Sequence, residues 1–252
     1  MRKTLLAISL LTTAPAALAE ALPVTVDVIG DSVHYTGDLN ADAVAKLADQ
    51  VKASNGSVAK LVIDSGGGDV NVGMDLAEIV LAAELDVIVK RLCASSCANY
   101  VFPAGKRKQI NPGAVVIWHG SAIQESLMAG PTLEDIKFED GAALSGPDKM
   151  ALFESWRGDA IRYVEDAKVR QNALFKKIGI DDRITVMGQQ LKAAQEWTVS
   201  IKDMERFGIR NVSAADNYGL NVPAEVAERG VKLLRLDDFP DYAAALSSQT
   251  PG

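Results

Sequence analysis

The first half of the chain alternates between short apolar runs and longer stretches in which apolar residues recur every three or four positions. Short apolar runs are typical of buried strands, and the longer spacing is typical of amphipathic helices. The pattern predicts strands over residues 24–29, 32–36, 60–63, 86–92 and 114–118. It predicts helices over residues 41–53, 70–83 and 96–104. Strands that alternate with crossover helices indicate an α/β fold built from parallel β-α-β units.

A polar segment and then one long helix are predicted in the second half. Residues 121–146 are polar and interrupted by glycine and proline, so we expect an exposed loop or lid beside His119. Residues 147–178 have helical spacing, with Pro147 in the first turn and Gly179 just past the end. The helix has more apolar positions than one narrow stripe needs, which indicates packing against a second copy and favours a homo-oligomer.

The N-terminus has the layout of a cleavable secretory signal. Two basic residues, Arg2 and Lys3, precede an apolar run, and a series of small residues ends at Ala19. We therefore expect 1–19 to be a signal peptide cleaved after Ala19, and 20–252 to form one α/β domain that is secreted or periplasmic. No later segment approaches the roughly 20 apolar residues that span a bilayer, so no transmembrane segment is expected after signal removal.

The charge balance argues against a nucleic-acid partner. The chain carries 26 basic and 33 acidic residues, which gives a formal charge of −7. Removal of the signal takes away Arg2 and Lys3, which leaves 24 basic residues and a formal charge of −9. Because an acidic chain repels the phosphate backbone, we expect no nucleic acid among its partners.

The chain has two cysteines, Cys93 and Cys97, and two histidines, His34 and His119. Cysteines four residues apart in a secreted chain favour a local disulfide, provided that a bend brings their Cα atoms within about 7 Å. Such a disulfide would brace the bend that contains Ser95 and Ser96, or act as a redox switch if it were reduced. Structural zinc normally takes four ligands, so we expect neither a metal nor another cofactor.

Three motifs between residues 61 and 120 supply groups that acyl-transfer chemistry needs. An apolar run ends in Ser65-Gly66-Gly67-Gly68-Asp69, whose backbone can approach a ligand closely and provide an oxyanion hole. The segment Cys93-Ala94-Ser95-Ser96-Cys97 provides a hydroxyl nucleophile, and Trp118-His119-Gly120 provides an imidazole that can take its proton. The motifs therefore occur in the order oxyanion hole, nucleophile and base.

With these motifs, the chain resembles the Clp-type serine peptidase superfamily, which also includes signal peptide peptidase A and, more distantly, the crotonases. The resemblance covers about residues 33–212. The early motifs of that superfamily are similar to Thr36-Gly37, Ser65-Gly66-Gly67-Gly68 and Gly73-Met74. Its nucleophile, base and late segments are similar to residues 94–105, 115–119 and 198–209. The resemblance implies a ClpP/crotonase-like spiral of ββα units, commonly assembled into rings through the long helix.

The resemblance also implies roles for particular residues. Counted back from the Ala-Gly that ends the predicted helix, Ser96 lies at the nucleophile position of Clp peptidases, and we favour it. Ser95 fits the Ala-Ala-Ser triplet and is the alternative nucleophile, and both serines could instead only cap the helix. His119 is the expected base. The backbone N–H groups of Gly67 and of Cys97, which follows Ser96, are the expected oxyanion hole.

The third member of a catalytic triad is not evident from the sequence. The family's aspartate lies just before the segment that begins at Thr198, but residues 186–192 of this chain contain no acid. Candidates elsewhere are Asp166, Asp181, Asp182 and Glu196. A Ser-His dyad is the alternative, and loss of the orienting carboxylate can cost about 10⁴ in rate. A Ser-Lys dyad is a further route, although the basic run Lys106-Arg107-Lys108 is read more simply as a solvated turn.

Three functions are compatible with these observations. The first is a secreted serine hydrolase, in particular a peptidase that acts on a peptide or protein substrate. It would be independent of ATP, because an ATP-driven unfoldase partner would be out of place outside the cytoplasm. The second is a catalytically degenerate scaffold or binding protein of the cell envelope. The third, a crotonase-like acyl-CoA enzyme, is disfavoured because coenzyme A is cytoplasmic and no basic pocket is evident near the glycines.

Overall fold

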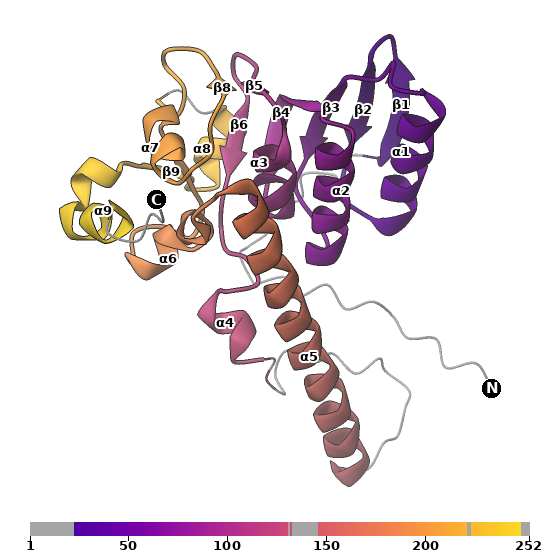
Figure 1. Ribbon diagram of the computed structural model, residues 1–252. Coiled ribbons are helices and arrows are strands. Elements are labelled where there is room, and N and C mark those ends of the chain that lie inside the picture. Colours follow the sequence, from indigo (N-terminus) through magenta and orange to yellow (C-terminus); the bar gives the residue numbers. More distant parts are fainter. Residues whose placement is uncertain (1–22, 131, 133–145, 221–222, 248–252) are drawn as a thin grey trace.

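The computed structural model describes residues 23–130, 132, 146–220 and 223–247 (Figure 1). The expected signal peptide at 1–19 and most of the expected loop at 121–146 lie outside the described residues. Within the described ranges, no helix combines the length and the apolar character that crossing a membrane requires.

A mostly parallel sheet forms the body of the described chain. Its strands are β1 (Thr25–Ile29), β2 (Ser32–Thr36), β3 (Lys60–Ser65), β4 (Asp86–Ala94), β5 (Lys108–Ile110), β6 (Val115–Ile117) and β8 (Val212–Ser213). The strand order is β1-β2-β3-β4-β5-β8, and β6 also pairs with β4. β1 is antiparallel to β2, and the other described pairs in this sheet are parallel. The chain is therefore a mixed α/β protein, as its alternating pattern predicts.

Two helices, α1 (Ala41–Ala53) and α2 (Val70–Ala82), lie side by side over the same face of the sheet (Figure 1). The side chains of Asn40 and Asp69 cap their first turns, and each accepts a hydrogen bond from the backbone N–H three residues on. The apolar side chains of both helices pack on the inward-facing side chains of the strands. This core includes Leu47, Leu61, Ile63, Leu76, Val80, Val87 and Val89.

The end of β4 leads directly into a helical segment made of a π-helical turn, η1 (Cys97–Val101), and α3 (Phe102–Ala104). Farther along, α5 (Gly146–Ile178) begins one residue before the long helix that the sequence predicts. One end of α5 extends away from the body, beside α4 (Glu125–Met128) (Figure 1). The smaller elements that follow are η3 (Asp182–Thr185), α6 (Met187–Gln190), β7 (Trp197–Val199), α7 (Ile201–Arg206), α8 (Ala224–Glu228), β9 (Lys232–Leu234), η4 (Leu236–Asp238) and α9 (Pro240–Ser247). β7 and β9 pair in parallel.

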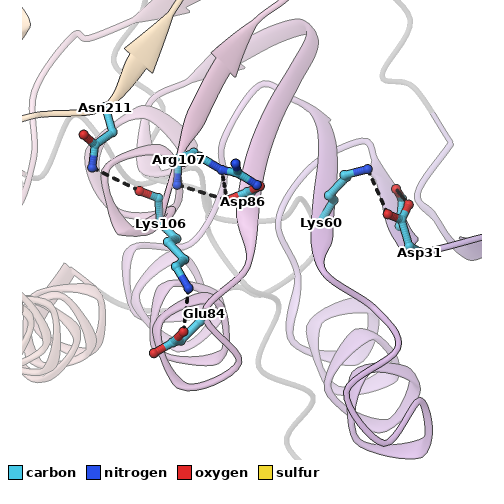
Figure 2. Close-up of polar contacts among 8 residues, drawn as sticks. Asp31, Lys60, Glu84, Asp86, Lys106, Arg107 and Asn211 are labelled. Atoms are coloured by element: carbon cyan, nitrogen blue, oxygen red, sulfur yellow. Dashed lines mark hydrogen bonds and ion pairs between the residues drawn. The ribbon is translucent and has the colours of Figure 1, made fainter.

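Charged residues line the edge of the sheet where the parallel strands begin (Figure 2). Ion pairs there join Asp31 with Lys60, Glu84 with Lys106, and Asp86 with Arg107. The expectation of a solvated turn at 106–108 is wrong at Lys108, which starts β5 and is 7% exposed. Its Nζ donates a hydrogen bond to the carbonyl oxygen of Arg210 at 2.9 Å. Burial lowers the pKa of this lysine to about 8.

Candidate functional site

The residues with candidate chemistry gather at the opposite edge of the sheet, where the parallel strands end. β3 leads into the glycine loop, residues 65–68, and β4 ends immediately before Ser95. β6 ends two residues before His119. Since β4 pairs with both β3 and β6, these three strand ends are neighbours. Ligands of open α/β sheets bind at the carboxyl ends of the strands, so this edge is the candidate site.

Ser95 lies on a sharp turn between β4 and η1. Its backbone φ is +56°, a left-handed conformation that is uncommon for a residue other than glycine. The Ser95 N–H donates to the carbonyl of Ile117 at 3.0 Å, and the N–H of Asn99 donates to the Ser95 carbonyl at 2.8 Å. Ser95 is partly exposed, and its hydroxyl makes no hydrogen bond with the part of the chain that the structure describes. A strained strand-to-helix turn is the geometry that presents the serine of many hydrolases.

Ser96 has a different environment. It is 2% exposed, and its Oγ donates a hydrogen bond to the carbonyl oxygen of Gly68 at 2.8 Å. Its Cβ also faces the helix α2, because a methyl group added to Gly73 would lie 2.9 Å from it. The Ser96 hydroxyl therefore holds the glycine loop against the helical turn and is shielded from solvent.

The glycine loop packs closely against the turn at Ser95. Gly67 has φ of +101°, and a Cβ added there would lie 2.5 Å from the Cβ of Ser95 and 3.0 Å from the N of Ser96. Only glycine fits this approach without a shift of the neighbouring backbone. One of the two expected oxyanion donors is engaged, because the N–H of Gly67 donates to the Oγ of Ser65 at 3.1 Å.

His119 is partly buried, and burial lowers its pKa. The positive charge of Arg229 also lowers this pKa, while the negative charge of Glu196 raises it. A histidine with a lowered pKa is neutral near pH 7 and can accept a proton. Its backbone carbonyl accepts a hydrogen bond from Nε2 of Gln189 at 2.8 Å. Among the described residues, no hydrogen bond joins the imidazole to the hydroxyl of Ser95 or Ser96.

Of the four acids considered from the sequence, Glu196 lies beside His119. Trp118 and Trp197 exchange two backbone hydrogen bonds, of 2.8 and 2.9 Å, in an antiparallel bridge. In an antiparallel pair, the residue that follows Trp118 lies opposite the residue that precedes Trp197. His119 is therefore opposite Glu196. Both carboxylate oxygens of Glu196 accept hydrogen bonds from Arg229, at 3.0 and 2.5 Å. Glu196 is thus held by an ion pair at the edge of the site.

The other acids have different surroundings. Asp181 forms an ion pair with Arg183. Burial, with the nearby charge of Asp181, raises the pKa of Asp182. Asp166 is exposed on α5. None of these three contributes to the shift in the pKa of His119, whereas Glu196 does.

The basic run at 106–108 lies at the far end of β4 from Ser95. Lys108 pairs with Val87, near the start of β4, and Ser95 follows its last residue. Nine residues of extended strand place these ends about 25 Å apart. A Ser-Lys dyad between them is therefore incompatible with this fold.

Cys93 and Cys97 lie at disulfide-bonding distance, with Cα atoms 5.3 Å apart, as the bend between strand and helix allows. Both are buried. Over the described residues, no group of three or more histidine, cysteine, aspartate or glutamate side chains is arranged to hold a metal ion.

Sequence reasoning missed two residues at this site, Gln189 and Arg229. Gln189 falls in the segment where the resemblance implies an aspartate, and it donates to the backbone carbonyl of His119, not to the imidazole. Arg229 lies 33 residues beyond Glu196, so no local pattern connects them. A comparison with known protein-family models finds no match to this chain, and a search of curated proteins finds no similar one. The functional argument therefore depends on the geometry of this site.

Proposed function

We propose that this protein is a secreted, ATP-independent serine hydrolase of the Clp type that cleaves peptides or proteins. The observation that carries the proposal is the turn at Ser95. It combines a left-handed backbone, a partly exposed hydroxyl and close packing against a glycine loop, at the carboxyl ends of parallel strands. This combination presents a serine hydroxyl at the strand edge, and His119, at the end of a neighbouring strand, is the proposed base that activates it.

The geometry favours Ser95 over Ser96 as the nucleophile, although the spacing of the sequence favours Ser96. An attacking oxygen must be reachable by a carbonyl carbon and must not be committed to another partner. The Ser96 hydroxyl is buried and donates to Gly68. Ser95 is partly exposed, and its hydroxyl makes no hydrogen bond with the described residues.

In the proposed reaction, Ser95 Oγ attacks the scissile carbonyl carbon while His119 takes the hydroxyl proton. The helical segment begins after Ser95, and its first intrahelical bond is the one from the N–H of Asn99 to the Ser95 carbonyl. The N–H of Ser96 is therefore a first-turn amide, suited to stabilise the oxyanion. The N–H of Gly67 joins it once the Ser65 hydroxyl turns away. His119 then protonates the leaving amine, and water hydrolyses the acyl-enzyme.

Glu196 is the proposed orienting carboxylate. It lies opposite His119 and acts on its pKa. A carboxylate in this position stabilises the imidazolium that forms during attack.

Two further parts of the proposal concern the fold and the assembly. The parallel sheet and its helices support the ClpP/crotonase-like spiral, and the disulfide-distance cysteines support an extracellular or periplasmic location. Exposed apolar side chains on α5, including Leu152 at 54% and Val169 at 69%, support a homo-oligomer.

The test is hydrolysis of fluorescent casein and of a nitrophenyl ester by the purified protein and by Ser95→Ala and Ser96→Ala. We expect Ser95→Ala to lower kcat/KM at least about 10³-fold. Ser96→Ala is the matched control. It should retain activity within a few fold and lose about 1 kcal/mol of stability with its buried hydrogen bond. Activity that survives in Ser95→Ala but is lost in Ser96→Ala would assign the nucleophile to Ser96.

A second candidate function is a non-catalytic scaffold of the cell envelope. Two observations favour it: the N–H of Gly67 is already bound to Ser65, and Glu196 is held by Arg229. A scaffold would show no hydrolysis in any variant. Its biological effect would be unchanged in Ser95→Ala/Ser96→Ala.

A further inference from the structure

Cys93 and Cys97 enclose the turn that carries Ser95. Cys93 is the penultimate residue of β4, and Cys97 is the first residue of η1. Both are 0% exposed, and their Cα atoms are 5.3 Å apart. A bond between them closes a small ring, with only Ala94, Ser95 and Ser96 between the two cysteines.

This ring constrains a conformation that the chain does not adopt readily. The left-handed backbone of Ser95, with φ of +56°, persists only where the surroundings enforce it. Two backbone hydrogen bonds also hold the turn, from Ser95 N–H to Ile117 and from Asn99 N–H to Ser95. A turn with fewer constraints would open these two bonds first.

Ring size and burial together indicate what such a bond does. A cross-link stabilises the whole fold less when the loop that it closes is short, and this loop is very short. Its main effect is therefore local. Reduction requires a thiolate to reach one of the sulfur atoms, and both cysteines are shielded. The arrangement accordingly favours a permanent brace over a redox switch.

We propose that the Cys93–Cys97 disulfide is a positioning element that holds Ser95 in its left-handed conformation, with its hydroxyl exposed at the strand edge. The effect of the disulfide on the reactivity of Ser95 rests on the proposed function. Its effect on the mobility of the turn does not. The two effects can therefore be measured separately.

The test compares the wild-type protein with Cys93→Ala/Cys97→Ala and with Val44→Ala, a variant that loses stability in α1, away from the turn. The mass of the wild-type protein, with and without reduction and alkylation, first establishes the bond. Amide hydrogen exchange is then measured at Ser95 and Asn99. The rate and half-saturation of labelling by a fluorophosphonate probe are measured in parallel.

We expect both amides to exchange at least about tenfold faster in the double variant and to be unchanged in Val44→Ala. The labelling rate at saturation should fall by a similar factor, while the half-saturating probe concentration stays constant. Reoxidation of reduced wild-type protein should restore its rate. Unbonded cysteines in the wild-type protein, or unchanged exchange in the double variant, overturn the inference. If the amides exchange faster in the double variant but the wild-type protein itself is never labelled by the probe, the inference about the disulfide stands. That result counts against the proposed function alone.

Discussion

Gly67→Ala tests whether the glycine loop and the turn at Ser95 depend on one another. The added methyl group would lie 2.5 Å from the Cβ of Ser95, 2.7 Å from the carbonyl oxygen of Ala94 and 3.0 Å from the N of Ser96. Two of these atoms belong to the backbone, so a rotamer change cannot relieve the overlap. The φ of +101° costs an L-residue about 1–2 kcal/mol, and overpacking adds about 1–3 kcal/mol. We expect the free energy of unfolding to fall by roughly 2–5 kcal/mol.

Urea unfolding of Gly67→Ala and of Gly56→Ala measures this effect. Gly56 also has a positive φ, of +85°, but no atom lies within 4 Å of its added methyl group. Gly56→Ala therefore carries the conformational cost alone, about 1–2 kcal/mol. We also expect Gly67→Ala to lower hydrolysis or probe labelling at least about tenfold in protein that remains folded, because Ser95 must move. Equal losses of stability and unchanged labelling in the two variants would refute the close packing of loop and turn.

Three further predictions concern other parts of the molecule. Arg229→Ala removes a positive charge that lowers the pKa of His119, so this pKa should rise. The acid limb of the pH-rate profile should then move to higher pH, and an unchanged imidazole titration by NMR would contradict the arrangement. Folding lowers the pKa of Lys108 from its ordinary value of 10.5 to about 8. Between pH 8 and pH 10.5, the lysine is therefore protonated in the unfolded chain and neutral in the folded chain. Stability should therefore rise over this window, by at most about 1.4 kcal/mol per pH unit, and Lys108→Met should abolish the rise in denaturation curves. Leu152→Glu, at a 54% exposed position, should leave the circular dichroism spectrum of the folded chain unchanged and reduce the mass measured by light scattering if α5 joins copies of the chain.

The helices α1 and α5 were predictable because their signals are local. The capping residue Asn40 and the spacing of Val44 and Leu47 define α1, and the long run that ends at Gly179 defines α5. β5 was missed because its first residue belongs to a basic run. Lys108 is buried, and its ammonium group donates to the carbonyl of Arg210, a residue 102 positions away.

The site shows the same division between local and distant information. Sequence spacing identified the strand ends that carry Ser95, Ser96 and His119, and it favours Ser96 as the nucleophile, whereas the geometry favours Ser95. The distinction depends on backbone φ and on a hydrogen bond to Gly68, 28 residues away. The position of Glu196 opposite His119 likewise depends on a bridge between two distant tryptophans.

The central claim, that Ser95 is an activated nucleophile, is tested most directly by tandem mass spectrometry after treatment with a fluorophosphonate probe. Trypsin cleavage after Arg91 and Lys106 releases the peptide 92–106, which holds two serines, Ser95 and Ser96. We predict a single adduct on Ser95 in the native protein and none after denaturation. An adduct on Ser96, or none on either serine of a correctly folded protein, would contradict the claim.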